Sequence, residues 1–115
     1  MDLNHLHLHV KGLVRSQSFY QTYLGFKEDR RCDEILFLRN KEGFDLALLP
    51  DSKPEPLPNW FHFGFRLTSA DEVRQLYSRL RAEGIGIDMP LFEEKDLVSF
   101  RCLDPDGYRI EFYWE

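Results

Sequence analysis

The chain has 115 residues, of which 43% are hydrophobic and 30% are charged, and its formal net charge is −5. This composition is typical of one soluble globular domain, and the negative charge argues against nucleic acid or an anionic membrane as the main partner. No apolar run reaches the length of a membrane span, and the N-terminus lacks the pattern of a signal peptide. Cys32 and Cys102 do not form a C-x-x-C motif, so we expect two reduced thiols in a cytoplasmic protein.

The first predicted strand, residues 3–10, has an unusually polar face. Leucine and histidine alternate along it, and residues two apart in a strand share a face. His5, His7 and His9 therefore lie on one face, and the aliphatic side chains lie on the other. We expect the histidine face to line a polar site.

A helix is predicted next, over residues 16–24. Ser16 suits the N-cap position and Gly25 suits the stop. Two strands are predicted at residues 35–39 and 44–49, joined by a tight Asn-Lys-Glu-Gly turn. This half of the chain therefore has the order strand, helix, short strands, turn, strand.

A proline-rich segment separates the two halves. Residues 50–59 contain four of the six prolines, and proline fixes φ and removes a backbone donor, so this segment predicts a stiff linker. We expect one domain over residues 1–115, with a first module at about 1–49 and a second at 60–115.

The second half repeats the order of the first. A strand is predicted around His62, and a helix follows that begins at the capping box of residues 69–72 and ends at Gly84. Two further strands are predicted near 98–103 and 108–114, joined by an Asp-Pro-Asp-Gly turn. Such internal similarity indicates two copies of one structural unit.

Strand parity collects polar residues on one face of the second module as well. The opposite faces carry phenylalanine, isoleucine and tryptophan, so the helix is expected on that side and a polar site on the other. The polar set comprises His62, Gly64, Arg66, Ser99, Arg101, Arg109, Glu111 and Tyr113.

Three stretches together resemble the vicinal oxygen chelate superfamily, which includes glyoxalase I, extradiol dioxygenases, fosfomycin-resistance thiol transferases and bleomycin-resistance proteins. They are Leu-Asn-His-Leu at residues 3–6, Phe-Tyr followed by Leu-Gly-Phe within 19–26, and Asp-Pro-Asp-Gly followed by glutamate within 104–111. The resemblance covers nearly the whole chain. It implies an α+β fold in which two tandem βαβββ modules form a curved mixed-sheet cup, as in glyoxalases.

The resemblance also implies a metal site. The family's ligands map onto His5, His62 and Glu111, which would hold a divalent ion such as Fe, Mn, Zn or Ni. A fourth ligand position, used in glyoxalase I, falls on Ala47, which cannot bind a metal. The set of two histidines and one carboxylate leaves coordination positions open for a substrate.

Other residues on the polar faces are candidates for chemistry. Without a carboxylate at position 47, proton transfer needs another base, for which Asp45 and His7 are the candidates. Tyr113 is a candidate proton donor, or else it only fills the cup.

Substrate contacts are predicted for His9, Arg66 and Arg101. The arginines would clamp a carboxylate or phosphonate, or else balance charge inside the cup. Arg101 lies ten residues before Glu111, where the dioxygenase and thiol-transferase branches carry tyrosine, and this departure predicts an anionic substrate. His9, near the strand end, is either a substrate contact or a solvated histidine.

Three functions remain open. The leading one is a metal-dependent lyase, dioxygenase or thiol transferase acting on a small substrate with neighbouring oxygens. The alternatives are a non-catalytic drug-binding or metabolite-binding protein of the bleomycin-resistance type, and a small-molecule sensor or accessory subunit. We expect a homodimer, for which Trp60 and Trp114 offer apolar contact surface, and no nucleic-acid or membrane partner.

Overall fold

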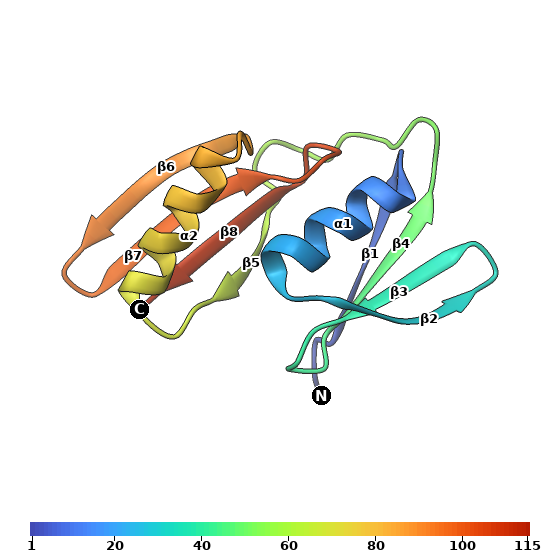
Figure 1. Ribbon diagram of the computed structural model, residues 1–115, viewed down its shortest axis with the longest axis horizontal. Coiled ribbons are helices and arrows are strands. Elements are labelled where there is room, and N and C mark those ends of the chain that lie inside the picture. The colour runs from blue at the N-terminus through green and yellow to red at the C-terminus, as the bar shows by residue number, and fades with distance from the viewer. The chain divides into compact units, whose positions relative to one another are not determined.

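The computed structural model describes all of residues 1–115, and the chain divides into two compact units, Met1–Pro56 and Leu57–Glu115. These are called unit one and unit two below. Each unit has the element order strand, helix and three strands (Figure 1). Unit one contains β1 (His5–Val10), α1 (Leu13–Leu24), β2 (Lys27–Cys32), β3 (Ile35–Arg39) and β4 (Asp45–Pro50), and unit two contains β5 (Phe63–Arg66), α2 (Ala70–Ala82), β6 (Ile87–Glu94), β7 (Leu97–Leu103) and β8 (Arg109–Trp114).

The two sheets have the same topology. The strand order is β1-β4-β3-β2 in unit one and β5-β8-β7-β6 in unit two. In each sheet the first strand pairs in parallel with the last, and the remaining pairs are antiparallel. The predicted α+β fold of two βαβββ modules is therefore confirmed.

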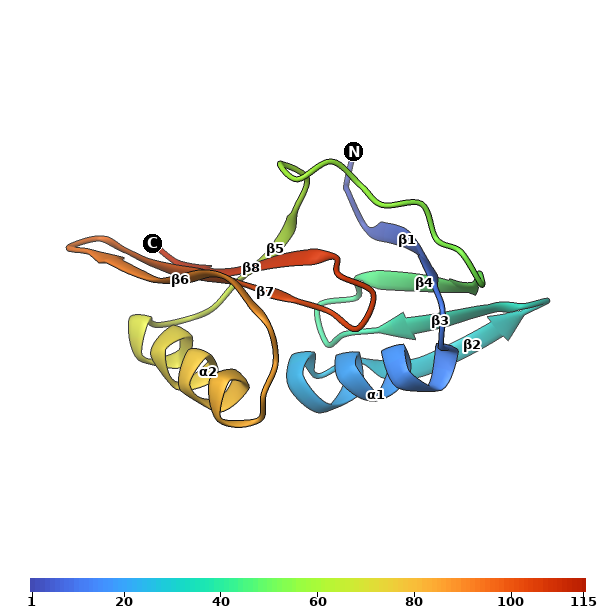
Figure 2. The same cartoon turned by 90° about the horizontal axis from the view of Figure 1, so that it is seen from above.

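Each helix lies along one face of its own sheet, as Figure 2 shows. The helix α1 contacts β4, and α2 contacts β6, β7 and β8. The side chains between helix and sheet are apolar and buried, so one face of each sheet is committed to the core. They include Val10, Phe19, Tyr20, Leu36, Leu38, Leu46 and Leu48 in unit one and Val73, Leu80, Val98, Phe100, Ile110 and Phe112 in unit two.

The predicted strand parity is confirmed by burial. Along β1, Leu8 and Val10 are buried while His5 and His7 are exposed. Burial alternates in the same way along β7 and over the first four residues of β8. The polar residues therefore occupy the sheet faces that the helices leave open.

The start of α1 was predicted wrongly. The helix begins at Leu13, not at residue 16, and its N-cap is Gly12, which makes no side-chain capping bond. Ser16 is fully buried within the helix, and its N–H donates to the Gly12 carbonyl at 3.0 Å. The predicted stop is confirmed, because Gly25 adopts the left-handed conformation with φ of 73°.

The capping box of α2 is confirmed. The N–H of Glu72 donates to Ser69 Oγ at 3.1 Å, and the Glu72 carboxylate accepts from the Thr68 N–H at 2.9 Å. Neither helix of the chain is long and apolar enough to cross a membrane.

Two strands were not predicted. All six residues of β2 are exposed, so it has no apolar alternation to reveal it. The strand β6 contains Pro90 and two register shifts against β7, which suits an edge position. His62 lies just before β5 rather than inside it, because the ladder with β8 begins at Phe63.

Candidate metal-binding site

Unit two brings two of the predicted metal ligands together. His62 Nε2 lies 3.2 Å from Glu111 Oε2, and about 30% of each side chain is exposed. His62 comes from the segment that leads into β5, and Glu111 from the neighbouring strand β8. The pair therefore rests on the parallel β5–β8 ladder and opens onto the sheet face away from α2.

The contact of the second ring nitrogen of His62 indicates which nitrogen of the neutral ring carries the proton. His62 Nδ1 lies 3.2 Å from the Trp60 carbonyl oxygen, which can only accept a hydrogen bond. In the neutral imidazole the proton therefore belongs on Nδ1, and Nε2 presents a lone pair to the carboxylate. Two lone pairs at this distance repel unless a proton or a metal cation lies between them. A backbone carbonyl on the far nitrogen is also the usual arrangement behind a metal-binding histidine.

Gly64 makes room for the Glu111 side chain. The two residues are paired in the β5–β8 ladder. A Cβ added at Gly64 would lie 3.0 Å from the Glu111 carbonyl oxygen and 3.2 Å from the Glu111 Cβ. A side chain at position 64 would therefore push against the backbone that carries the carboxylate.

His5 has an arrangement similar to that of His62. Its Nδ1 lies 3.0 Å from Asn4 Oδ1, so its Nε2 is left for another ligand. In unit one His7 pairs with Ala47, and in unit two Gly64 pairs with Glu111. His5 and His62, each two residues earlier, therefore occupy equivalent positions in the repeat.

The same register equates Ala47 with Glu111, and this is where a fourth ligand would lie. Neither unit contains by itself a group of three or more His, Cys, Asp or Glu side chains that could hold a metal ion. The predicted set contains His62 and Glu111 of unit two and His5 of unit one, and it stays a prediction. Nitrogen and carboxylate donors of this kind fit Fe, Mn, Zn or Ni.

Asp45, a predicted base, lies next to two arginines. Its carboxylate accepts hydrogen bonds from Arg39 Nε at 2.7 Å and Arg39 Nη2 at 3.2 Å, and Arg30 Nη1 lies 3.7 Å away. The hydrogen bond from Arg39 lowers the pKa of the Asp45 carboxyl. The carboxylate is therefore a weaker proton acceptor than an unpaired aspartate.

The other histidines of β1 differ in their contacts. His9 Nδ1 lies 2.9 Å from Asp51 Oδ2, and this hydrogen bond lowers the pKa of the Asp51 carboxyl. The exposed His7 ring lies 5.3 Å from the His9 ring, centroid to centroid. His7 is therefore the more accessible of the two, whereas His9 is held at the strand end.

The predicted substrate-binding arginines lie in unit two with different surroundings. Arg66 Nη2 donates to the Glu115 carbonyl at 2.6 Å. Arg101 is paired with Glu111 across the β7–β8 ladder but makes no ion pair with it. Tyr113, two residues after Glu111, is partly buried and is paired with Ser99 and Arg66.

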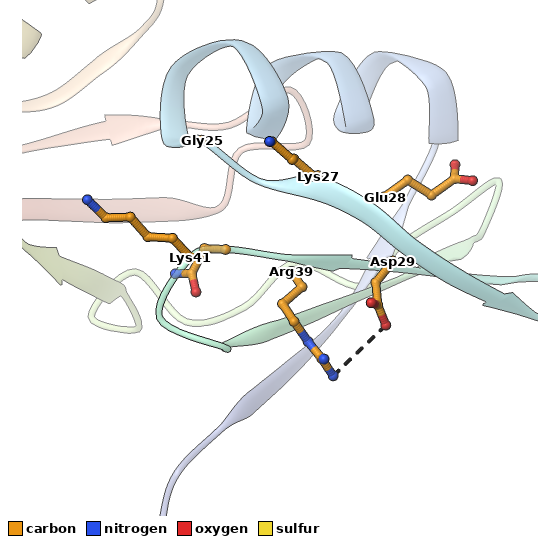
Figure 3. Close-up of a pocket in the computed structure, with 7 residues that line it drawn as sticks. Gly25, Lys27, Glu28, Asp29, Arg39 and Lys41 are labelled. Carbon is orange, nitrogen blue, oxygen red and sulfur yellow. Dashed lines mark ion pairs between the residues drawn. The ribbon is translucent and has the colours of Figure 1, made fainter.

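A separate pocket of about 250 Å³ lies in unit one (Figure 3). Its lining includes Lys27, Lys41 and an ion pair between Arg39 and Asp29 at 3.9 Å. None of the predicted site residues lines it.

Sequence reasoning placed Gly64 on the open face but missed the supporting role of three groups around the candidate ligands. They are Gly64, the Trp60 carbonyl and the Asn4 side chain. A glycine between two phenylalanines inside a predicted strand was a signal of close backbone approach. The Trp60 carbonyl leaves no trace in the sequence.

Two βαβββ units with the same strand order define a small α+β protein built from two copies of one module. The chain matches the family model of the Glyoxalase/Bleomycin resistance protein/Dioxygenase superfamily over residues 2–112. It belongs to this family.

Individual proteins and solved structures are also similar to this chain over most of its length. The chain is 31% identical to the uncharacterized protein PA2024 of Pseudomonas aeruginosa, over 96% of this chain and 86% of that one. It is 30% identical to a probable trivalent organoarsenical cleaving enzyme of Bacillus subtilis, over 99% and 80% of the two chains. A solved structure of a possible glyoxalase from Bacillus cereus is 27% identical, with a TM-score of 0.82 and 97% of each chain covered. Further relatives at 27–29% identity are named as lactoylglutathione lyases, a metallothiol transferase and a glutathione transferase.

Proposed function

We propose that the protein is a metal-dependent enzyme in which His62 and Glu111 bind a divalent ion and a small molecule binds beside it; His5 stays the predicted third ligand. The observation that carries the proposal is the position of His62. Its Nδ1 faces the Trp60 carbonyl, and its Nε2 lies 3.2 Å from the Glu111 carboxylate. This arrangement presents two electron-pair donors to a single cation.

A divalent ion held there would supply a Lewis acid for neighbouring oxygens of a substrate. The protein contributes the positions of the donors. Trp60 fixes the orientation of the His62 ring, and Gly64 allows the Glu111 backbone to lie close to β5. Because Ala47 offers no fourth ligand, more of the coordination sphere remains for the substrate.

The reaction class is inferred from the remaining side chains and the relatives. His7 is our candidate for moving a proton, since it is exposed on the face of His5, whereas Asp45 is held by Arg39. The relatives include lyases and thiol transferases. These names favour lyase or thiol-transferase chemistry over oxygenation, and Tyr113 is retained as a candidate proton donor on the face of Glu111.

The test is metal binding by protein purified without a tag and stripped of metal. Titration with Mn, Zn, Ni or Fe(II), followed by calorimetry and elemental analysis, should show one equivalent bound per chain. His62→Ala should retain the fold and lose more than about tenfold in affinity, since tenfold is the scale of losses from supporting residues alone. Wild-type affinity in His62→Ala would refute the ligand assignment.

His9→Ala is the matched histidine control for metal binding. Its ring nitrogen is engaged by Asp51, so its removal should leave the stoichiometry at one. The enzyme proposal is then tested by turnover of lyase and thiol-transferase substrates with the metal restored. Stoichiometric binding of a small molecule without turnover would instead indicate the bleomycin-resistance type of function.

We further propose that the protein acts as a homodimer in the cytoplasm. The indole of Trp60, next to the His62 segment, is an exposed apolar surface, because this residue is 74% exposed. A single species of 13.8 kDa in sedimentation at micromolar concentration would contradict the dimer.

A further inference from the structure

Arg101 differs from every other arginine of the chain. The other nine each have a hydrogen bond, an ion pair or a ring contact. Arg101 has none, although its side chain is partly buried. No buried side-chain nitrogen of the protein lacks a partner, so the five donors of the Arg101 guanidinium are accessible and free to bind an anion.

The nearest acidic partner of Arg101 in the sheet is Glu111, which does not bind it. Across the open face of unit two, the register places Gly64, Glu111, Arg101 and Met89 in one row of neighbouring strands. Cross-strand partners share a face, so Arg101 lies beside the Glu111 carboxylate. That carboxylate faces His62 instead.

From this juxtaposition we infer that Arg101 is the specificity-determining residue of the site, and that it binds a carboxylate, phosphonate or similar oxyanion of the substrate. The inference rests on the proposed metal site, since the same substrate would present its neighbouring oxygens to the ion. The planar guanidinium accommodates two oxygens of such a group by paired hydrogen bonds.

The surrounding side chains suit an anion with a short apolar body. Met89 lies on the far side of Arg101 in the same row and is 46% exposed. Phe92 pairs with Ser99 in the next row and is 48% exposed. The substrate would therefore extend from the metal ligands over Arg101 toward a small apolar edge.

The first experiment uses matched hydroxamates, which chelate metals through two neighbouring oxygens. Acetohydroxamate tests the metal site alone, and succinic monohydroxamic acid adds a carboxylate arm. The primary amide of that acid keeps the arm and removes its charge. Calorimetry with the metal-loaded protein should show the acid bound at least about tenfold more tightly than the amide, the scale of a charge-assisted hydrogen bond.

Two variants assign the preference to Arg101. Arg101→Gln should bind acid and amide equally while retaining wild-type affinity for acetohydroxamate. Arg79→Gln removes the same charge from α2, where Arg79 pairs with Glu83, and should keep the preference for the acid. Equal affinity for acid and amide in the wild type would overturn the inference, as would a preference that survives in Arg101→Gln.

A metal-free arm separates this inference from the proposed function. In the stripped protein, the arginine Nε–H resonance that disappears in Arg101→Gln should shift saturably with succinate and not with succinamide. If acetohydroxamate and metal fail to bind, the proposed metal site is wrong, and the succinate titration decides the role of Arg101 by itself. An unchanged resonance in that titration would then overturn the inference.

Discussion

Asn40 and Asp104 occupy equivalent turns in the two units and make the same hydrogen bonds. Each side-chain oxygen accepts from the backbone N–H groups two and four residues later, at 3.1 and 2.9 Å for Asn40 and at 2.8 and 3.0 Å for Asp104. The turn glycines that follow, Gly43 and Gly107, have φ of 85° and 87°. The repeat is therefore preserved in the turn that leads to Ala47 in one unit and to Glu111 in the other.

Asp104→Ala should destabilise the protein by about 1–3 kcal/mol, because the N–H groups of Asp106 and Tyr108 lose their acceptor. Asp104 is only 5% exposed, so water replaces this acceptor poorly. Asp104→Asn should cost less, since the chain uses asparagine for the same bonds at position 40. Urea unfolding followed by circular dichroism measures both. An equal loss of stability in the two variants would show that the bonds to the side-chain oxygen are not the source.

Gly64→Ala should lower metal affinity by about tenfold or more, the scale found for residues that support ligands. The added methyl group would press on the Glu111 backbone, and strain of this kind costs about 1–3 kcal/mol of stability. Gly86→Ala is the control, because its new Cβ would meet only the flexible Leu103 side chain at 3.4 Å. Metal titration should find the control unchanged, and an unchanged affinity in Gly64→Ala would remove Gly64 from the site.

The pairing of Asp45 with Arg39 predicts a specific dependence of stability on pH. The hydrogen bond from Arg39 lowers the pKa of Asp45 in the folded state, so the pair stabilises the fold above the unfolded pKa of about 3.9. This contribution is lost as the pH falls through the lower, folded pKa. The stability difference between wild type and Asp45→Asn should therefore shrink below about pH 4. Urea unfolding between pH 7 and pH 2.5 tests this, and a constant difference would contradict it.

The two cysteines should differ sharply toward a thiol reagent. Cys32 is exposed, whereas Cys102 is buried, and burial raises the pKa of the Cys102 thiol to about 12. Since the thiolate is the reactive form, one thiol per chain should be labelled at pH 8, and two in denaturant. Cys32→Ser should reduce native labelling to none. Rapid labelling of two native thiols would contradict the burial of Cys102.

Apolar residues spaced two apart, or three to four apart, predicted most of the strands and the helices. Burial of one face of an element requires such a spacing. The strand β2 left none, since its charged side chains are all exposed and only backbone pairing with β3 defines it. The start of α1 was also hidden, because Val14 is 81% exposed and Gly12 caps without a side chain.

Parity alone placed His62 and Glu111 on open faces, but it does not fix which residues meet. Their contact depends on the parallel register of β5 with β8, which pairs segments nearly fifty residues apart. The hydrogen bond from His62 to the Trp60 carbonyl depends on the path of the backbone before β5. The ion pair that holds Asp45 likewise follows from the β3–β4 register.

All strand pairings lie within one unit or the other, and the pairings of the first sheet end at Pro50. Synthesis on the ribosome proceeds from the N-terminus, and domains generally fold as units in that order. All strands of the first sheet are therefore synthesised before β5. The second sheet is built entirely from residues synthesised later. Once the residues up to Pro50 have emerged from the ribosome, the nascent chain holds every strand that its first hydrogen-bond ladder needs.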